Sequence, residues 1–210
     1  MKVLLVNGSP HQEGSTYTCL KEVEQVLNDC GILTQIFQVG TDPISSCRGC
    51  GACNELKKCV INDKVNEFVE LAKSADGYIF GSPVHYAGAY GNLISFMNRV
   101  FFSASRSGEE IFRLKPASAI VCARRAGCTS AFDELNKFFS INEMPIISSR
   151  YWNMAFGSNA EQVKQDEEGM QIMRILGHNM AYHLKCQEFA TKLGLERPAK
   201  ETVNYTNFIR

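Results

Sequence analysis

The 210-residue chain is 45% apolar and carries 22 basic and 22 acidic side chains, so its formal net charge is zero. This length and composition suffice for one domain with one good core. A nucleic-acid-binding protein would normally show a basic excess or stripe, and the sequence has neither. The apolar run that ends at Asn7 is too short for a signal peptide, and no run reaches transmembrane length. A cytoplasmic protein is expected.

Predicted strands and helices alternate along the chain. Short apolar runs bounded by Gly, Pro or Asn predict strands at residues 2–7, 33–39, 77–80, 118–123 and 145–148. Helical spacing predicts helices from a cap at Ser15 or Thr16 to Asn28, and over residues 64–74 (capped by Asp63), 93–102, 129–140 and 168–193. This succession predicts an open parallel sheet with helices on both faces, formed by residues 1–193. The polar tail 194–210 is expected to fray or to pack on the domain or a partner subunit.

Four of the nine cysteines form one C-x2-C-x2-C-x5-C pattern, at Cys47, Cys50, Cys53 and Cys59, within a loop spanning residues 45–63. Gly49 and Gly51 permit the tight backbone turns that would bring the thiols together. Compact runs of this kind are typical of iron–sulfur clusters, whereas structural zinc usually takes two separated pairs. The pattern favours a [4Fe–4S] cluster. Zinc, and free or redox-active thiols, are the alternatives.

The other cysteines, Cys19, Cys30, Cys122, Cys128 and Cys186, are scattered and are expected to be small buried or half-buried residues. Cys128 is a special case, because it lies at the predicted start of a helix and close to two arginines. Both features are expected to lower the pKa of its thiol.

The loop at residues 8–16 is the first candidate ligand site. In an open parallel sheet, ligands bind beyond the carboxyl ends of the strands, so the loops after the first, third and fourth strands are the candidates. The first loop leads into a helix N-terminus, which attracts anions, and Ser9, Ser15 and Thr16 add hydroxyl donors. It lacks the lysine of a nucleoside-triphosphate loop and is not a G-x-G-x-x-G fingerprint. It therefore suits a monophosphate ester such as FMN. Alternatively, Ser15 and Thr16 only cap the helix.

The loop after the fourth strand contains Arg124, Arg125 and Gly127. The paired arginines would stabilise negative charge on a reduced flavin or hold the phosphate of a nicotinamide nucleotide. A solvated surface role is the alternative.

Several motifs of the first half of the chain occur together: Gly8-Ser9-Pro10 with Gly14-Ser15-Thr16, the four cysteines followed by Val60-Ile61-Asn62-Asp63, and Ala75-Asp76 leading into Gly81-Ser82-Pro83-Val84. Together they resemble the NAD(P)H-dependent FMN reductases of the flavodoxin-like superfamily, and the cysteine spacing resembles that of the iron–sulfur flavoproteins. The resemblance extends to Gly88, Leu93, Phe96 and Arg99, and the second half matches mainly in layout.

The resemblance implies a flavodoxin-like three-layer sandwich whose five-stranded parallel sheet has the order 2-1-3-4-5. It also implies that FMN binds with its phosphate on the first loop and its ring against the loop after the third strand. The candidate cofactor-binding residues are Ser9, Pro10, His11, Gly14, Ser15, Thr16, Ser82, Pro83, Val84, His85, Tyr86, Gly88, Arg124, Arg125 and Gly127. His85 stands where the family pattern suggests tyrosine, and it would contact the ring or lie indifferently on the surface. Tyr86 and Tyr90 are candidates for stacking or for ordinary packing.

These features predict an oxidoreductase in which FMN takes a hydride from NADH or NADPH and passes electrons to a small-molecule or protein acceptor. The flavin carries the chemistry, so no catalytic side chain is expected. If the four cysteines hold a cluster, the flavin would convert the two-electron input into single-electron steps. The resemblance implies that the cluster loop approaches FMN across a subunit interface, in a homodimer or homotetramer. The alternatives are a flavodoxin-type electron carrier, or a plain FMN or quinone reductase with free redox-active cysteines.

Overall fold

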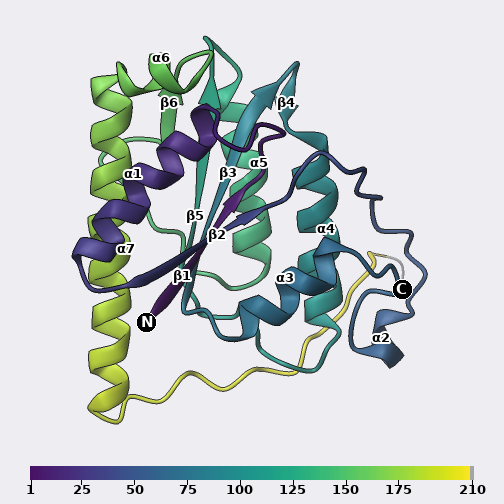
Figure 1. Cartoon of the computed structure of the whole chain (residues 1–210). Coiled ribbons are helices and arrows are strands. Elements are labelled where there is room, and N and C mark those ends of the chain that lie inside the picture. Colours follow the sequence, from purple (N-terminus) through teal and green to yellow (C-terminus); the bar gives the residue numbers. More distant parts are fainter. Residues whose placement is uncertain (209–210) are drawn as a thin grey trace.

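The computed structural model describes residues 1–208, so the predicted tail is described except for its last two residues. A parallel sheet lies at its centre (Figure 1), with strands β1 (Lys2–Asn7), β2 (Leu33–Gln38), β3 (Gly77–His85), β5 (Ala117–Ala123) and β6 (Met154–Phe156) in the order β2-β1-β3-β5-β6. A short strand, β4 (Gly88–Ala89), pairs antiparallel with the end of β3. The predicted strand order is confirmed, with β4 as an additional hairpin.

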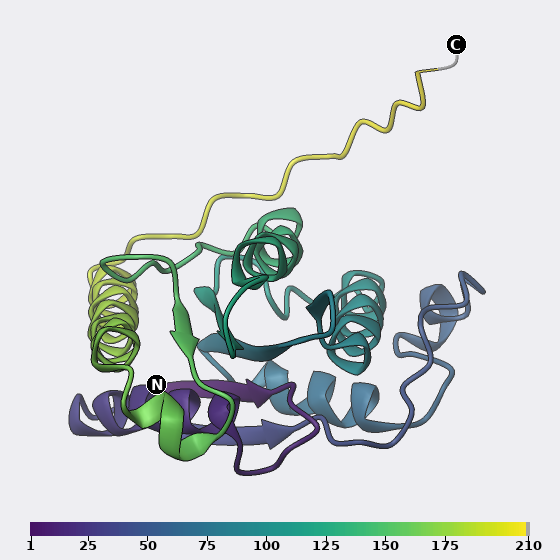
Figure 2. The same cartoon turned by 90° about the horizontal axis from the view of Figure 1, so that it is seen from above.

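Helices cover both faces of the sheet (Figure 2). Helices α1 (Ser15–Asp29) and α7 (Glu167–Lys192) pack on one face, and α3 (Lys64–Lys73), α4 (Gly91–Ser105) and α5 (Cys128–Ile141) pack on the other. Two short helices that the sequence did not predict, α2 (Cys53–Leu56) and α6 (Ala160–Lys164), lie in connecting segments. The predicted three-layer sandwich is therefore confirmed.

Successive residues of the central strands enter opposite cores, as the two-residue period of a strand requires. In β1, Leu4 and Val6 face α3, α4 and α5, while Val3 and Leu5 face α1 and α7. All four side chains are fully buried, which is why this strand reads as a continuous apolar run in the sequence.

The position predicted for the fifth strand is wrong. Residues 145–148 make only an isolated bridge, between Ile146 and Ala117, and the pairing strand is β6. The chain leaves the sheet between these two points and returns at Asn153, whose side-chain amide donates to the Ala119 carbonyl oxygen. The edge position of this interrupted strand explains the error, because two short pairings there replace one continuous run.

The predicted cap of the first helix is also wrong. Gly14 is the N-cap residue of α1 and makes no side-chain hydrogen bond, and Ser15 is already helical. The predicted cap of α3 is confirmed, because the Asp63 carboxylate accepts a hydrogen bond from the backbone N–H of Val65. Among residues 1–208, no helix combines the length and apolar character needed to cross a membrane.

The tail from residue 195 onward forms no helix or strand as far as it is described, and its side chains are exposed. Arg113 holds one point of it, donating two hydrogen bonds of 3.1 Å to the Pro198 carbonyl oxygen. Figure 2 shows the tail extending beyond the helical layers. Packing of the tail on a partner subunit stays a prediction.

Candidate active site

A pocket of about 910 Å³ opens at the carboxyl end of the sheet, and we call it the flavin pocket. Its volume lies within the usual range for small-ligand sites. Its walls come from the ends of β3 and β5 and from the segments that follow β1, β5 and β6. The lining residues are Ser9, Pro10, His11, Gln12, Glu13, Gly14, Ser15, Thr16, Pro83, Val84, Cys122, Ala123, Arg124, Gly157, Ser158, Asn159, Ala160 and Glu161.

The first loop is shaped from below by Asn7, which is fully buried. Its side-chain oxygen accepts a hydrogen bond from the backbone N–H of Ser9, and its amide donates to the Gln38 side-chain oxygen at 2.6 Å. Gln38 in turn donates to the Ser9 carbonyl oxygen at 2.8 Å. Because the ends of β1 and β2 thus fix both backbone polar groups of Ser9, the loop is held before any ligand binds.

The N-terminus of α1 faces this pocket with unused donors. The first backbone N–H groups of a helix have no partner within it, and no side chain caps this one. The Thr16 hydroxyl is buried and has no hydrogen-bond partner within residues 1–208. No acidic side chain lies in the first turn of α1. This set of donors, together with the helix dipole, fits a phosphate group.

The β3–β4 hairpin contributes only part of the predicted ring-binding set to the pocket wall. Pro83 and Val84 line the pocket. Ser82 lies buried behind them, where its hydroxyl oxygen accepts a hydrogen bond from the backbone N–H of Tyr90. His85 and Tyr86 project from the hairpin tip, Tyr86 with its side chain fully exposed and a backbone φ of 60°. Neither residue lines the pocket.

In the loop after β5, too, only some of the predicted residues line the pocket. Arg124 lines the pocket, whereas Arg125 is exposed outside it. Gly127 has a φ of 90° and packs so closely on Val84 that an added methyl group would lie 2.9 Å from a Val84 methyl. The predicted lowering of the Cys128 pKa is wrong, because burial raises the pKa of this thiol to about 12.

The fourth wall, residues 157–161, was missed by the sequence reasoning. It follows β6, whose position was predicted wrongly. The available signal was Gly157-Ser158-Asn159, a turn followed by a helix cap, and the Asn159 side chain does accept a hydrogen bond from the backbone N–H of Gln162.

The four patterned cysteines line a second cavity, of about 30 Å³, together with Arg99, Phe102 and Ser103 of α4. Cys47 and Cys50 are exposed, Cys59 is half-buried and Cys53 is buried. Figure 1 shows this segment leaving the end of β2 and descending beside α4. The two cavities share no lining residue. Within residues 1–208, no group of three or more His, Cys, Asp or Glu side chains is arranged to hold a metal ion.

The sequence matches the model of the NADPH-dependent FMN reductase family over residues 1–159. The chain belongs to this family. As predicted, it is therefore an oxidoreductase of the flavin-binding class.

Two curated relatives resemble the chain over most of its length. An iron–sulfur flavoprotein of Methanocaldococcus jannaschii is 30% identical over 194 residues, covering 88% of this chain and 98% of that protein. An iron–sulfur flavoprotein of Archaeoglobus fulgidus is 28% identical over 177 residues, covering 80% of this chain and 90% of that protein. Among solved structures, an archaeal flavodoxin superposes with a TM-score of 0.58 at 14% identity, covering 88% of this chain and 99% of that chain. This likeness confirms the flavodoxin-like fold.

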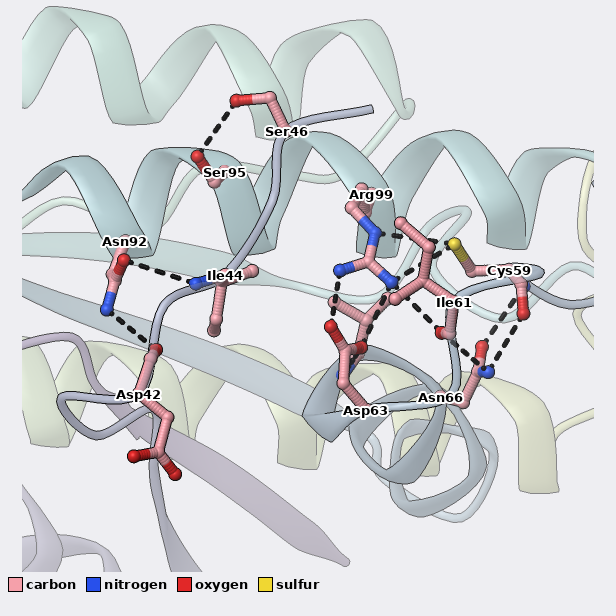
Figure 3. Close-up of polar contacts among 11 residues, drawn as sticks. Asp42, Ile44, Ser46, Cys59, Ile61, Asp63, Asn66, Asn92, Ser95 and Arg99 are labelled. Atoms are coloured by element: carbon pink, nitrogen blue, oxygen red, sulfur yellow. Dashed lines mark hydrogen bonds and ion pairs between the residues drawn. The ribbon is translucent and has the colours of Figure 1, made fainter. Parts of the chain in front are cut away.

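In this member of the FMN reductase family, Arg99 of α4 contacts the end of the segment that carries the four cysteines, residues 42–63, which we call the cysteine segment (Figure 3). The side chain is only 1% exposed. It forms an ion pair with Asp63 and donates to the Cys59 sulfur at 3.3 and 3.2 Å. Burial lowers the pKa of the guanidinium, but the hydrogen bonds to Asp63 and Cys59 outweigh this effect and raise its pKa above the usual value. Arg99 is therefore a buried permanent cation beside a cysteine sulfur.

Proposed function

We propose that the protein is an FMN-dependent oxidoreductase that uses NADH or NADPH as hydride donor and delivers electrons to an acceptor through a [4Fe–4S] cluster. The observation that carries the flavin assignment is the uncapped start of α1 in the flavin pocket, with its buried and unpartnered Thr16 hydroxyl. Family membership supports the same cofactor.

In this proposal the first loop holds the FMN phosphate through Ser9, Ser15, Thr16 and the backbone N–H groups of His11 and Gly14, while Pro10, which has no N–H, shapes the loop. Pro83 and Val84 contact the ring, with His85, Tyr86 and Gly88 at its rim, and Ser82 fixes the hairpin from behind. Arg124 lies where it would stabilise negative charge, while Arg125 and Gly127 support the loop. Bound FMN would supply the hydride and electron chemistry, and the surrounding residues bind, orient and shield it.

The cluster assignment rests on chemistry and on relatives. Four cysteines around one cavity are the ligand set of a [4Fe–4S] cluster, and the two relatives described above are named iron–sulfur flavoproteins. The cavity has room for only one or two water molecules. Cluster assembly would therefore require the exposed turn carrying Cys47 and Cys50 to move outward.

We also propose a homodimer or homotetramer in which the cysteine segment of one copy approaches the flavin pocket of another. Within one chain the two cavities share no residue, and Arg99 lies about 12 Å along α4 from Gly91, where the pocket's hairpin ends. Cys47 and Cys50 face outward, as a ligand pair near an interface would. Light scattering on the eluted protein would measure the assembly, and a monomer would contradict this part.

The decisive test of the enzyme is steady-state oxidation of NADH and NADPH by FMN-loaded protein, with ferricyanide, a quinone or free flavin as acceptor. Turnover with either nucleotide is expected. FMN binding without any turnover would instead indicate a flavodoxin-type carrier. Iron and acid-labile sulfide are measured separately after anaerobic reconstitution. Turnover without iron would indicate a plain flavin or quinone reductase with free cysteines.

A further inference from the structure

One face of α4 contacts both ends of the cysteine segment (Figure 3). Asn92 accepts a hydrogen bond from the backbone N–H of Ile44 and donates to the Asp42 carbonyl oxygen at 3.0 Å, and the hydroxyls of Ser95 and Ser46 lie 3.0 Å apart. Arg99 follows on the same face. Positions 92, 95 and 99 are spaced as neighbours along one side of a helix. Helix α4 therefore fixes the start of the segment with Asn92 and Ser95, and its end with Arg99.

Cys59 is the most firmly held of the four cysteines. The Asn66 side chain accepts a hydrogen bond from its backbone N–H at 3.0 Å and donates to its carbonyl oxygen at 2.9 Å. Asn66 belongs to α3, so Cys59 is clamped between two helices by backbone and sulfur contacts alike. Cys47 and Cys50, by contrast, lie on exposed backbone without regular secondary structure.

The guanidinium of Arg99 donates hydrogen bonds to three residues. Besides its contacts with Asp63 and the Cys59 sulfur, it donates to the Ile61 carbonyl oxygen at 3.0 Å. A buried arginine needs a partner to offset the cost of burial, and Asp63 supplies one. Asp63 alone would satisfy a structural ion pair. The two additional N–H contacts to sulfur are not needed for it.

We propose that Arg99 is a positioning residue that orients the Cys59 sulfur as the pre-formed ligand of the cluster and raises the reduction potential of the cluster by donating to that sulfur. The proposal rests on the cluster assignment made above. Groups that hydrogen-bond to ligand atoms orient them, and their loss typically costs 10–100-fold in metal affinity. Hydrogen bonds to the sulfurs, and nearby positive charge, favour the reduced and more negative state of a cluster.

The experiment compares wild-type protein, Arg99→Met and Arg99→Lys, each reconstituted anaerobically with iron and sulfide. Arg174→Met is the matched control, because Arg174 forms an exposed ion pair with Glu22 on the opposite side of the sheet. Circular dichroism first establishes that each variant is folded. Two quantities are then measured: iron retained against a chelator, and the midpoint potential of the cluster by spectroelectrochemistry.

Arg99→Met is expected to lose iron at least tenfold more readily than wild type. At a fixed applied potential, its ratio of reduced to oxidised cluster should fall about tenfold, which for a one-electron couple is a negative shift of 59 mV. Arg99→Lys should retain iron to an intermediate degree, because one ammonium group cannot contact both Asp63 and Cys59 as the guanidinium does. Arg174→Met should match wild type in both quantities.

A folded Arg99→Met protein with wild-type iron retention and potential would overturn the proposal and leave the cluster assignment standing. If Arg99→Met does not fold, Arg99→Lys decides by the same two measurements, and equality with wild type again overturns the proposal. Wild-type protein that takes up no iron would remove both this proposal and the cluster assignment, while nucleotide oxidation would still judge the flavin assignment.

Discussion

The Ser15 hydroxyl donates a hydrogen bond to the Gly157 carbonyl oxygen at 3.2 Å, although the two residues are 142 positions apart in the chain. The contact joins the start of α1 to the loop after β6, so it closes the flavin pocket between its first and fourth loops. One consequence is that Ser15 has a structural partner already, whereas the neighbouring Thr16 hydroxyl does not. The two hydroxyls, adjacent in sequence, therefore differ in what they can offer a ligand.

Gly157→Ala should destabilise the protein and disturb the fourth loop of the flavin pocket. An added methyl group would lie 2.8 Å from the Cα of Val163 and still closer to its backbone nitrogen, and backbone atoms cannot rotate away. Such overpacking costs about 1–3 kcal/mol. For a chain of this size that corresponds to a fall of roughly 2–12 °C in the melting temperature. Thermal unfolding followed by circular dichroism measures it.

The matched control is Gly91→Ala at the start of α4, where nothing lies within 4 Å of the added methyl group. Its melting temperature should equal or slightly exceed that of wild type, because alanine favours the helix. A Gly157→Ala melting temperature equal to that of Gly91→Ala would show that the loop after β6 yields freely.

Thr16→Val should weaken FMN binding without harming the fold. Valine keeps the shape of the side chain, including the methyl group that packs beside Gly81, and removes only the hydroxyl. A hydrogen bond to a charged phosphate contributes about 1.5–3 kcal/mol, so the dissociation constant should rise by roughly 10- to 150-fold. Quenching of FMN fluorescence on titration with apoprotein measures this constant.

Stability should change little in Thr16→Val, because the hydroxyl has no partner among the described residues of the folded apoprotein. Ser105→Ala, which removes an exposed hydroxyl on α4, serves as the binding control. Equal FMN affinity in Thr16→Val and Ser105→Ala would mean that the phosphate lies elsewhere.

Much of the fold was predictable because apolar periodicity and local turn signals coincide. β1 is buried on both faces, and its continuous apolar run predicts a strand. Asp63 predicts the start of α3, because its carboxylate can cap a helix N-terminus. The edge strand was not predictable in this way. Its pairing is supported by the buried Asn153 side chain, whose amide donates to the Ser118 hydroxyl and the Ala119 carbonyl oxygen. No local sequence pattern predicts that a polar residue would take such a position in the sheet.

The residues of the candidate site likewise fall into two groups: some follow from local sequence, and others depend on tertiary packing. Ser9 and Thr16 could be named from sequence because loop and helix are contiguous there. The contribution of Gly157 depends on where β6 pairs, and that of Arg99 depends on how α4 packs against a segment 40 residues earlier. Such contacts between distant parts of the chain follow from tertiary packing, and sequence spacing does not encode them. The same packing explains Cys128, where burial outweighs the helix terminus.

Alkylation should distinguish exposed cysteines from buried ones. Contact with Cys122 and burial raise the pKa of Cys19 well above its usual value, and the two sulfurs lie 3.4 Å apart. Brief iodoacetamide treatment of native apoprotein at pH 8 should therefore label Cys47, Cys50 and Cys186, and spare Cys19, Cys122 and Cys128. Peptide mass spectrometry gives the labelled sites.

The control for alkylation is the same treatment in urea, where all nine cysteines should react. Rapid labelling of Cys128 in the native protein would restore the expectation of an activated thiol at the start of α5. Rapid labelling of Cys19 would contradict the packing of α1 against β5.

His183 should make the folded protein less stable in mild acid. Its Nε2 atom is buried without a hydrogen-bond partner among residues 1–208, and burial lowers the pKa of the imidazole below the usual value of 6.5. The unfolded chain therefore binds a proton more readily than the folded one once the pH falls below about 6.5. Stability is lost from there down to the lowered pKa of the folded state, and no further loss from this group is expected below it. In His183→Leu this part of the pH dependence should disappear, so the stability difference between pH 8 and pH 5 should shrink. Urea unfolding at both pH values measures it.

His183→Gln, which is polar but does not titrate, should behave like His183→Leu in this difference even if its absolute stability is lower. A wild-type pH dependence in both variants would show that the acid sensitivity arises from other groups.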